Sequence, residues 1–242
     1  MKKLNLKLFV LLGAIVVVFC VVINIKNNNR QDRQQETFEN VVRASAQVKR
    51  PKVAITFDDG PSTVYTKILL DGLKERGVKA TFFLTGQEIQ YSKDVVKRMA
   101  KEGHIIGNHT YSHVDLKKTN YKKAIKEIED TNNAIKEITG KKPKYIRPPY
   151  GDWDERLFKE TDMSIVLWSV DPEDWKDQNA SIVARRVIKN TTDGDVILLH
   201  DIFKTSVNAA FIIIDKLQSQ GYEFVTIDKL NSKKVIEKSR YN

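Results

Sequence analysis

Apolar and polar positions follow two alternating patterns from residue 51 onward. Short runs rich in β-branched and aromatic residues predict strands, and these lie at Val53–Phe57, Ala80–Leu84, His104–Asn108, Tyr145–Arg147, Ile165–Val170, Val196–Leu199 and Glu223–Ile227. Between them, apolar residues at helical spacing predict helices, which lie at Val64–Arg76, Lys93–Lys101, Tyr121–Thr139, Asp154–Thr161, Ala180–Lys189 and Thr205–Gln220. Strands that alternate with helices predict an α/β fold with a parallel sheet and right-handed crossovers. Such a sheet can close into a small (β/α) barrel or remain an open doubly wound sheet.

A different pattern precedes this segment. Residues 1–7 carry three lysines, and residues 8–25 are apolar apart from one glycine and one asparagine. The apolar run is near the lower length limit for a transmembrane helix. No small-residue cleavage site comes after it, which favours an uncleaved anchor over a signal peptide. The lysines then place residues 1–7 in the cytoplasm, so we expect a single-pass cell-membrane protein whose remaining chain is extracellular, with secretion as the alternative.

Charge and composition divide the rest of the chain into three parts. Residues 26–50 are polar with both charge signs and indicate a linker, residues 51–231 a globular domain, and residues 232–242 a C-terminal tail. The net charge of +10 favours anionic surroundings such as lipid or a cell-wall polymer. No compact arginine-rich stripe interleaved with aromatic residues is present, so we expect no nucleic-acid partner. The oligomeric state stays open.

Ionisable side chains gather at one end of the predicted strands. Five of the strands are followed by such groups, namely Asp58-Asp59, His109 with His113, Arg147, Asp171 to Asp174, and His200-Asp201. The carboxyl ends of parallel strands meet at one edge of a sheet, which is where α/β folds hold their active sites, so this asymmetry favours an enzyme. Two of these groups also have a purely structural explanation: Asp59-Gly60 is a common turn pair, and Asp201 can cap the helix that comes after it.

Three of these side chains can form a metal site. His109 and His113 are four residues apart, and on a helical turn both imidazoles would lie on one face. A carboxylate from Asp58 or Asp59 would complete a set of ligands with open positions for water, the usual arrangement of catalytic zinc. The two adjacent carboxylates would repel each other unless a cation or an arginine lies nearby. The histidine spacing alone is equally compatible with two exposed surface residues.

Together these segments resemble the NodB-like polysaccharide deacetylases of carbohydrate esterase family 4, in particular the peptidoglycan N-acetylglucosamine deacetylases. The resemblance covers Lys52–Leu230 and includes five motifs in the family's order: Thr56-Phe57-Asp58-Asp59-Gly60, His109-Thr110-Tyr111-Ser112-His113, Arg147-Pro148-Pro149-Tyr150-Gly151, Asp171-Pro172-Glu173-Asp174-Trp175 and Leu198-Leu199-His200. It implies a distorted (β/α) barrel, in agreement with the seven predicted strands.

The resemblance implies a metal site and a base. Asp59, His109 and His113 would hold one divalent metal ion, which we expect to be zinc, with cobalt or nickel as alternatives. Asp58 would be the general base that takes a proton from the attacking water. Arg147 would pair with Asp58, keeping this carboxylate ionised and oriented.

The remaining motifs imply an acid and a substrate pocket. His200 would be the general acid that protonates the leaving sugar amine, and Asp174 would favour its protonated form. The backbone N–H of Tyr150 would stabilise the oxyanion that develops on the attacked carbonyl. Trp175 and Leu198 would wall the pocket that accepts the acetyl methyl group.

The sequence therefore predicts a metal-dependent hydrolase that removes N-acetyl groups from N-acetylglucosamine in a cell-wall polysaccharide, with peptidoglycan as the first candidate. By family analogy, the intact Asp59 favours glucosamine-type over muramic-type substrates. Chitin oligosaccharides, an exopolysaccharide and acetylated xylan are alternative substrates. A catalytically silent wall-binding protein is an alternative of another class, although the presence of both Asp58 and His200 argues against it. A nucleic-acid hydrolase that uses the same metal is a third.

Overall fold

The computed structural model describes residues 26, 30, 33, 35, 36, 50–154, 156, 157, 161–230, 236 and 237. The chain divides into two units, residues 1–49 and 50–242. The described residues among 26–36 are helical. The predicted transmembrane segment 8–25 lies outside the described residues, and within the described part no helix is both long and apolar enough to cross a membrane.

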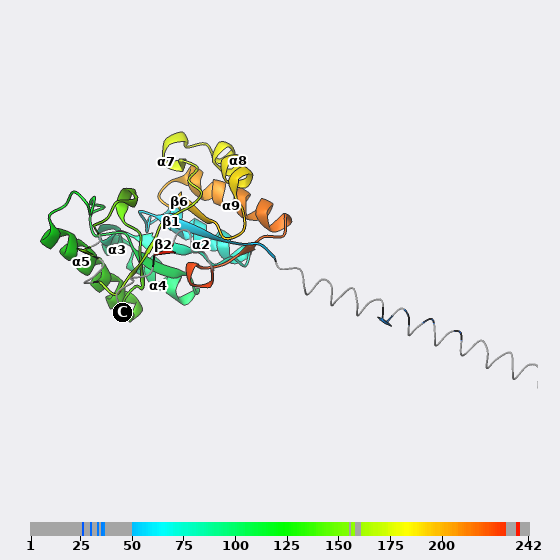
Figure 1. Ribbon diagram of the computed structural model, residues 1–242, viewed down its shortest axis with the longest axis horizontal. Coiled ribbons are helices and arrows are strands. Elements are labelled where there is room, and N and C mark those ends of the chain that lie inside the picture. The colour runs from blue at the N-terminus through cyan, green and yellow to red at the C-terminus, as the bar shows by residue number, and fades with distance from the viewer. Residues whose placement is uncertain are drawn as a thin grey trace, which may run out of the picture. The chain divides into compact units, whose positions relative to one another are not determined.

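The second unit alternates strands and helices, as the apolar pattern predicts (Figure 1). The strands are β1 (Lys52–Asp58), β2 (Thr81–Leu84), β3 (Ile105–Asn108), β4 (Tyr145–Ile146), β5 (Ser164–Val166), β6 (Val196–His200), β7 (Glu223–Phe224) and β8 (Ile236–Glu237). The helices are α2 (Tyr65–Glu75), α3 (Gly86–Tyr91), α4 (Lys93–Lys101), α5 (Tyr121–Thr139), α7 (Asp174–Asp177), α8 (Ala180–Asn190) and α9 (Lys204–Ser219). Two 3₁₀ turns complete the described elements, η1 (Pro149–Gly151) and η2 (Ile227–Lys229).

The described strands form one curled sheet. Its order is β6-β1-β2-β3-β4-β5-β8, and β7 pairs with β1. All pairs are parallel except β5 with β8. The sheet curls so far that Val170, beyond β5, forms a parallel bridge to Ile197 in β6, near the other end of the strand order. The architecture is thus a curled half-barrel of parallel strands, and the open doubly wound alternative is wrong.

Several elements differ from the predictions. The predicted strand Ile165–Val170 ends at Val166, because its parallel partner β4 ends at Ile146, which pairs with Ile165; the carbonyls of Val166 and Leu167 accept hydrogen bonds from a buried arginine. The antiparallel β8 lies in the segment expected to be a tail, and a strand of two residues leaves no periodic signal. The short helices α3 and α7 were not predicted for the same reason. Of the predicted helix at 154–161, the described residues 156 and 157 are helical, and most of the rest lies outside the described residues.

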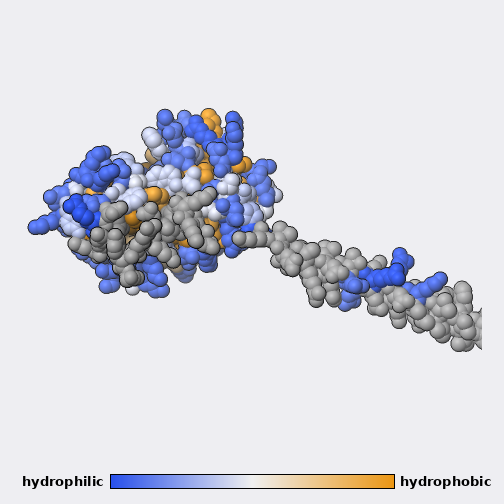
Figure 2. All heavy atoms as spheres, in the orientation of Figure 1, coloured by the Kyte–Doolittle hydropathy of each residue, from blue (hydrophilic) through white to orange (hydrophobic). Residues whose placement is uncertain are grey.

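Successive residues of β1 face opposite sides of the sheet, as strand geometry requires. Ile55 and Phe57 pack in the largest apolar cluster, together with residues of α2, α4, α8 and α9. Ala54 belongs to a second cluster on the other face, and Thr56 and Asp58 share that inner face by alternation. Both faces of the strand are therefore covered, which explains its nearly continuous apolar sequence. The surface turned to the viewer in Figure 2 is correspondingly hydrophilic for the most part.

The register of the parallel strands brings their carboxyl ends to one level. Asp58 at the end of β1 pairs with His200 at the end of β6. Asn108 at the end of β3 pairs with Leu84 in β2 and with Ile146 in β4. The residues just beyond these positions therefore meet at one edge of the sheet, as the sequence predicts.

Helix α5 contacts the end of β3 and is capped at both termini. Asn120 is its N-cap, and the Asn120 side chain accepts a hydrogen bond from the Lys122 N–H. Gly140 is its C-cap, and the left-handed φ of 76° fits the glycine predicted to cap this helix. Its buried face is partly polar, with Glu127, Thr131 and Asn132 among apolar neighbours. This polar part contacts the loops at the carboxyl edge of the sheet.

The alternation in β1 gives a stability prediction. Phe57 is fully buried and stacks on the Phe82 ring at a centroid distance of 5.3 Å. We expect Phe57→Ala to lower the free energy of unfolding by about 3–5 kcal/mol, because it removes a large apolar side chain and leaves a cavity. Urea denaturation monitored by circular dichroism measures the loss. The control is Ile68→Ala in α2, which is 47% exposed and should cost much less; equal losses for both variants would contradict the assignment of Phe57 to the core.

Candidate active site

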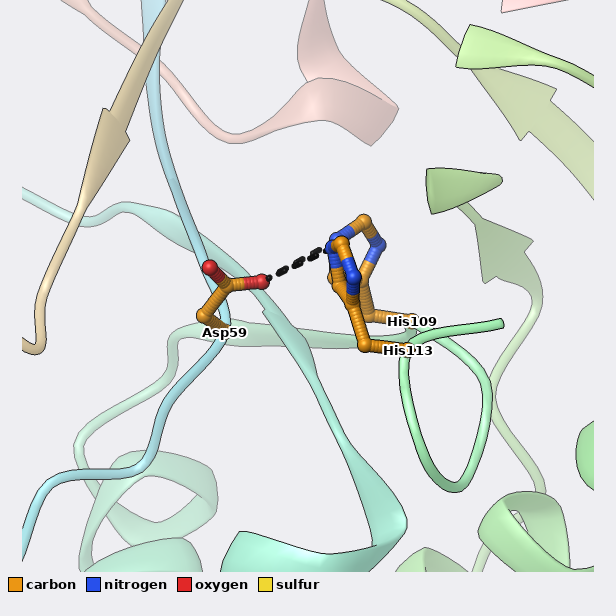
Figure 3. A group of neighbouring side chains, drawn as sticks. All are labelled: Asp59, His109 and His113. Atoms are coloured by element: carbon orange, nitrogen blue, oxygen red, sulfur yellow. Dashed lines mark ion pairs between the residues drawn. The ribbon is translucent and has the colours of Figure 1, made fainter. Parts of the chain in front are cut away.

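Two adjacent carboxylates stand at the end of β1, and the structure gives them different partners. Asp58 accepts a hydrogen bond from Arg147 Nη1 at 2.7 Å. Asp59 has a left-handed φ of 72°, and its Oδ1 lies 3.3 Å from Nε2 of both His109 and His113 (Figure 3). The sequence predicts that a cation or an arginine must relieve the repulsion between the two acids, and an arginine indeed lies against one of them.

Arg147 is fully buried and hydrogen-bonded through all three of its guanidinium nitrogens. Besides Asp58, its N–H groups reach Thr56 Oγ1 at 2.8 Å, Val166 O at 3.1 Å and Leu167 O at 3.0 Å. Its guanidinium carbon also lies 4.3 Å from the centroid of the Phe83 ring, in the geometry of a cation–π contact. Burial lowers the pKa of Arg147 while the Asp58 charge acts to raise it. The predicted pairing of Arg147 with Asp58 is present in the structure.

The two histidines lie in a loop, so the predicted helical turn is wrong. The backbone is left-handed at Thr110 and at His113, with φ of 63° and 55°, and the loop bends so that both imidazoles face Asp59 (Figure 3). The ring centroids are 5.0 Å apart. Left-handed backbone costs a residue other than glycine on the order of 1–3 kcal/mol, so the surroundings must hold this loop in place.

The hydrogen bond of His109 fixes which of its nitrogens is free. Its Nδ1 lies 2.7 Å from the carbonyl oxygen of Arg147. A carbonyl only accepts hydrogen bonds, so Nδ1 carries a proton and Nε2 is the nitrogen that faces Asp59. This is the tautomer and orientation that a metal-ligating histidine requires.

The three side chains fit a divalent metal ion. One ligand atom from each of Asp59, His109 and His113 lies within 4.8 Å of the others. Asp59 Oδ1, which faces both imidazoles, is buried and has no hydrogen-bond partner among the described residues. Such an oxygen is costly to bury unless a cation or a proton donor meets it. One carboxylate and two imidazoles form a ligand set that suits zinc and leaves positions open.

Electrostatics favour the ligand forms of these groups. Burial opposes the ionisation of Asp59, but the imidazoles of His109, His200 and His113 outweigh it and lower its pKa to about 2. Burial, together with the neighbouring His109, lowers the pKa of His113 below its ordinary value. At neutral pH the carboxylate is therefore charged and the His113 imidazole neutral, as metal ligands must be.

His200 is paired with Asp174 and lies near the second carboxylate oxygen of Asp59. Its Nδ1 lies 2.7 Å from Asp174 Oδ1, and its backbone N–H donates to Asp174 Oδ2 at 2.9 Å. Burial disfavours the imidazolium, but the hydrogen bond and charge of Asp174 outweigh it and raise the pKa of His200 to about 9. Its Nε2, 4.0 Å from Asp59 Oδ2, is thus a proton donor directed towards the metal site.

The three predicted substrate-binding residues lie in different surroundings. Tyr150 is 67% exposed, and its ring centroid is 5.0 Å from that of His113. Trp175 is 51% exposed beside Asp174, and Leu198 is buried in β6. A pocket of about 420 Å³ adjoins the metal site, and its lining consists of Asp59, Ser62, Thr63, Thr85, Gln87, Glu88, Ser112, His113 and Ile202. The roles assigned to Tyr150, Trp175 and Leu198 stay predictions.

Asp201 does not cap the next helix. It is fully buried, and its Oδ2 accepts a hydrogen bond from Thr66 Oγ1 at 2.5 Å, whereas α9 has Phe203 at its N-cap and no side-chain cap bond. Burial raises the pKa of Asp201 to about 7. Its carboxylate packs against Gly60, where an added Cβ would lie only 2.3 Å from Oδ1. Asp201 therefore supports the turn after Asp59, a role that sequence reasoning missed.

Sequence reasoning also missed Glu127 and Asn108. The position of Glu127 in the helical pattern could have identified it. Glu127 stands three residues after Ala124 and four before Thr131, on the stripe of α5 that faces inward. A charged residue on such a stripe indicates a buried polar partner, because an unpaired buried charge is costly. Asn108 ends a strand and gave no comparable signal.

Comparisons with known proteins decide the family. Residues 45–164 match the family model described as polysaccharide deacetylase. A peptidoglycan-N-acetylglucosamine deacetylase of Bacillus cereus is 42% identical, and the match covers 77% of this chain and 70% of that protein. This chain belongs to the polysaccharide deacetylase family. The resemblance inferred from the five motifs is thereby confirmed.

Further relatives of this polysaccharide deacetylase agree. The Bacillus subtilis peptidoglycan-N-acetylmuramic acid deacetylase PdaC is 42% identical over 86% of the chain, which spans only 45% of that longer protein. The solved structure of PdaC superposes with a TM-score of 0.73 at 44% identity, covering 75% of this chain and 90% of that one. The curled half-barrel is therefore the fold of a solved relative.

The pairing of His200 with Asp174 predicts the pH at which this imidazole titrates. In metal-free protein we expect NMR to show imidazolium up to about pH 9. Asp174→Asn should lower this pKa well below 9, because burial is then opposed only by the charges of Asp58 and Asp59. The pKa of His200 is higher in the folded protein than in the unfolded chain. The stability that the His200–Asp174 pair adds to the folded protein is therefore complete below about pH 6.5 and is lost as the pH rises through about 9. Asp174→Asn should accordingly lower the free energy of unfolding more at pH 6 than at pH 10. A wild-type His200 that titrates below 6.5 would contradict the pairing.

Proposed function

We propose that this chain is a metal-dependent N-deacetylase of cell-wall polysaccharide, and that its substrate is the N-acetylglucosamine of peptidoglycan. The cluster of Asp59, His109 and His113 carries the proposal, because the Asp58 carboxylate lies 3.8 Å from one of its members and the His200 imidazole lies 4.0 Å from another. Membership of the family supports the reaction class. The names of the two relatives support peptidoglycan but refer to different sugars, and the intact Asp59 is the reason for placing glucosamine first.

The residues that would hold the metal are Asp59, His109 and His113. Zinc is our first choice because two neutral imidazoles and one carboxylate match its preferences, with cobalt or nickel as alternatives. When bound, such an ion polarises a carbonyl and makes water acidic enough to be deprotonated at neutral pH. All three ligands come from loops at the carboxyl edge of the sheet, so the other reactive groups surround the same point.

Asp58 is the proposed general base. Arg147 occupies its Oδ1, and its Oδ2 lies 3.8 Å from His109 Nε2, on the side of the metal ligands. The ion pair with Arg147 fixes the position and orientation of the carboxylate. The oxygen that Arg147 does not bind would take a proton from the attacking water.

His200 is the proposed general acid. Asp174 engages its Nδ1, so Nε2 is the nitrogen left to give its proton to the sugar nitrogen as the amide C–N bond breaks. The Tyr150 N–H would donate to the developing oxyanion, and Trp175 and Leu198 would enclose the acetyl methyl group. The polar pocket next to Asp59 would seat the sugar ring, because hydroxyl and amide side chains such as Ser62, Thr63 and Gln87 line it.

We also propose that residues 8–25 anchor the enzyme in the cell membrane with the domain outside, secretion being the alternative. The lysines before the apolar run support this orientation, and the net charge of +10 suits an anionic wall. Protease treatment of intact cells tests the placement, because an extracellular domain is digested while a cytoplasmic one is protected.

Acetate release tests the reaction and its metal dependence. The purified protein should release acetate from peptidoglycan, should lose this activity with a chelator, and should regain it with zinc or cobalt. Chitin oligosaccharides, an N-acetylated exopolysaccharide and acetylated xylan, assayed side by side, decide among the alternative substrates. If the metal-loaded protein releases no acetate from any of them, the deacetylase proposal is wrong and the silent wall-binding alternative is favoured.

Two substitutions separate the metal from the base. His109→Ala should abolish metal binding and acetate release together, because it removes a ligand. Asp58→Asn should retain the metal and lower kcat at least about 100-fold, the usual contribution of a general base. Metal content by atomic absorption is read alongside the rate, and Asp71→Asn, which alters an exposed acid in α2, is the matched control. Wild-type turnover in Asp58→Asn would show that another group is the base.

A further inference from the structure

A buried glutamate holds the loop that carries both histidines. Glu127, on the inner face of α5, is only 8% exposed. Its Oε2 accepts a hydrogen bond from the Ser112 N–H at 2.7 Å, and its Oε1 accepts one from Ser112 Oγ at 2.8 Å. Ser112 directly precedes His113, so this carboxylate is bound to the backbone next to a metal ligand.

Both oxygens of Glu127 are directed to this one residue. Within the described part of the chain no lysine, arginine or histidine forms an ion pair with Glu127, and both hydrogen bonds to its carboxylate come from Ser112. A buried carboxylate without a cationic partner must be satisfied by hydrogen bonds. Displacing Ser112 would therefore leave the buried carboxylate of Glu127 without these two hydrogen bonds.

A second contact from α5 holds the start of the same loop. Asn108 Nδ2 donates to the carbonyl of Ile128 at 2.9 Å and to Asn132 Oδ1 at 2.8 Å. Its Oδ1 accepts the N–H of Thr110 at 2.7 Å, next to His109. Helix α5 thus forms hydrogen bonds with the loop next to each histidine. The Glu127 contact is the one next to His113, which is half-buried, whereas His109 is buried.

We propose that Glu127 is a positioning residue of the metal site, which acts through Ser112 to hold His113 in its left-handed conformation with its imidazole towards Asp59. This inference rests on the proposed function, because it assumes that these side chains bind a metal. Glu127 forms no hydrogen bond with a metal ligand, does not itself line the pocket, and belongs to none of the five motifs. Partners that orient ligands in this way typically change metal affinity by about 10–100-fold when they are removed.

The rival interpretation is that Glu127 only fastens α5 to the rest of the domain. Both interpretations expect Glu127→Ala to lower the melting temperature, so stability cannot separate them. They differ in metal affinity, which falls with a positioning role and stays constant with a purely structural one. Glu127→Gln tests the same difference with a smaller change, because its amide oxygen can still accept a hydrogen bond from the Ser112 N–H and its NH₂ can donate one to Ser112 Oγ. A positioning role predicts a partial loss of metal affinity in this variant, and a purely structural role predicts none.

The decisive measurement is the zinc dissociation constant of the full chain, from competition with a chromogenic chelator. We expect Glu127→Ala to weaken zinc binding by about 10–100-fold, and Glu127→Gln and Ser112→Ala to fall between Ala and wild type. The visible spectrum of the cobalt-loaded protein should shift in Glu127→Ala, because the coordination geometry is no longer fixed. Ile135→Ala is the matched control: it removes a buried side chain two turns further along α5 and should lower the melting temperature without changing zinc affinity.

Each outcome separates this inference from the proposed function. If wild type binds zinc and the Glu127 variants bind it within twofold, Glu127 is structural and the inference is wrong while the proposed function stands. If wild type binds no divalent metal, the proposed function fails and the inference with it. Should Glu127→Ala fail to fold, Glu127→Gln and Ser112→Ala decide: wild-type affinity in both overturns the positioning role, and weaker binding in both supports it.

Discussion

The ion pair between Arg147 and Asp58 is the constraint on which both the fold and the site depend. A guanidinium withdrawn from water is unstable unless its hydrogen-bonding groups find partners, and removal of one member of such a pair typically costs about 3–5 kcal/mol. Here the partners come from β1, from the end of β5 and from the residue after it, so the strands must converge around the arginine. Two of these partners are the carbonyls of Val166 and Leu167, so the arginine binds the chain where β5 ends. The ion pair itself fixes the orientation of the carboxylate proposed as the base.

Strand geometry explains how two neighbouring aspartates serve different purposes. Alternation along β1 directs Asp58 into the curled sheet, towards Arg147. The next residue, in regular strand conformation, would point to the helices, among Ile55 and Phe57. The left-handed backbone of Asp59 prevents this and turns its carboxylate to the imidazoles. Asp58 is thus paired with an arginine and Asp59 faces two imidazoles, of which His109 also lies 3.8 Å from Asp58 Oδ2.

The sequence predicts features that leave a long pattern in the chain, and it does not predict short elements or conformations set by contacts between distant segments. Long apolar patterns located the principal strands and helices, because burial on one or two faces leaves a period in the sequence. They did not locate α3, α7 or β8, which are too short to show a period. Ionisable residues after several strands located the site, because parallel strands bring their ends together. The conformation of the His109–His113 loop could not be read in this way, since left-handed backbone at Thr110 and His113 results from contacts with distant segments.

The residues that reasoning from motifs missed share a physical role. Glu127 and Asp201 are buried acids that hydrogen-bond hydroxyl groups, Ser112 beside His113 and Thr66 beneath the turn after Asp59. Neither is placed to react, yet each supports a backbone segment whose conformation is unfavourable on its own, at His113 in one case and next to Asp59 in the other. The reactive groups can be recognised from their chemistry, whereas these supports are defined only by which loop they meet in the folded chain. A protein could therefore keep every motif residue and still lose the proposed metal site through a substitution in α5 or at the end of β6.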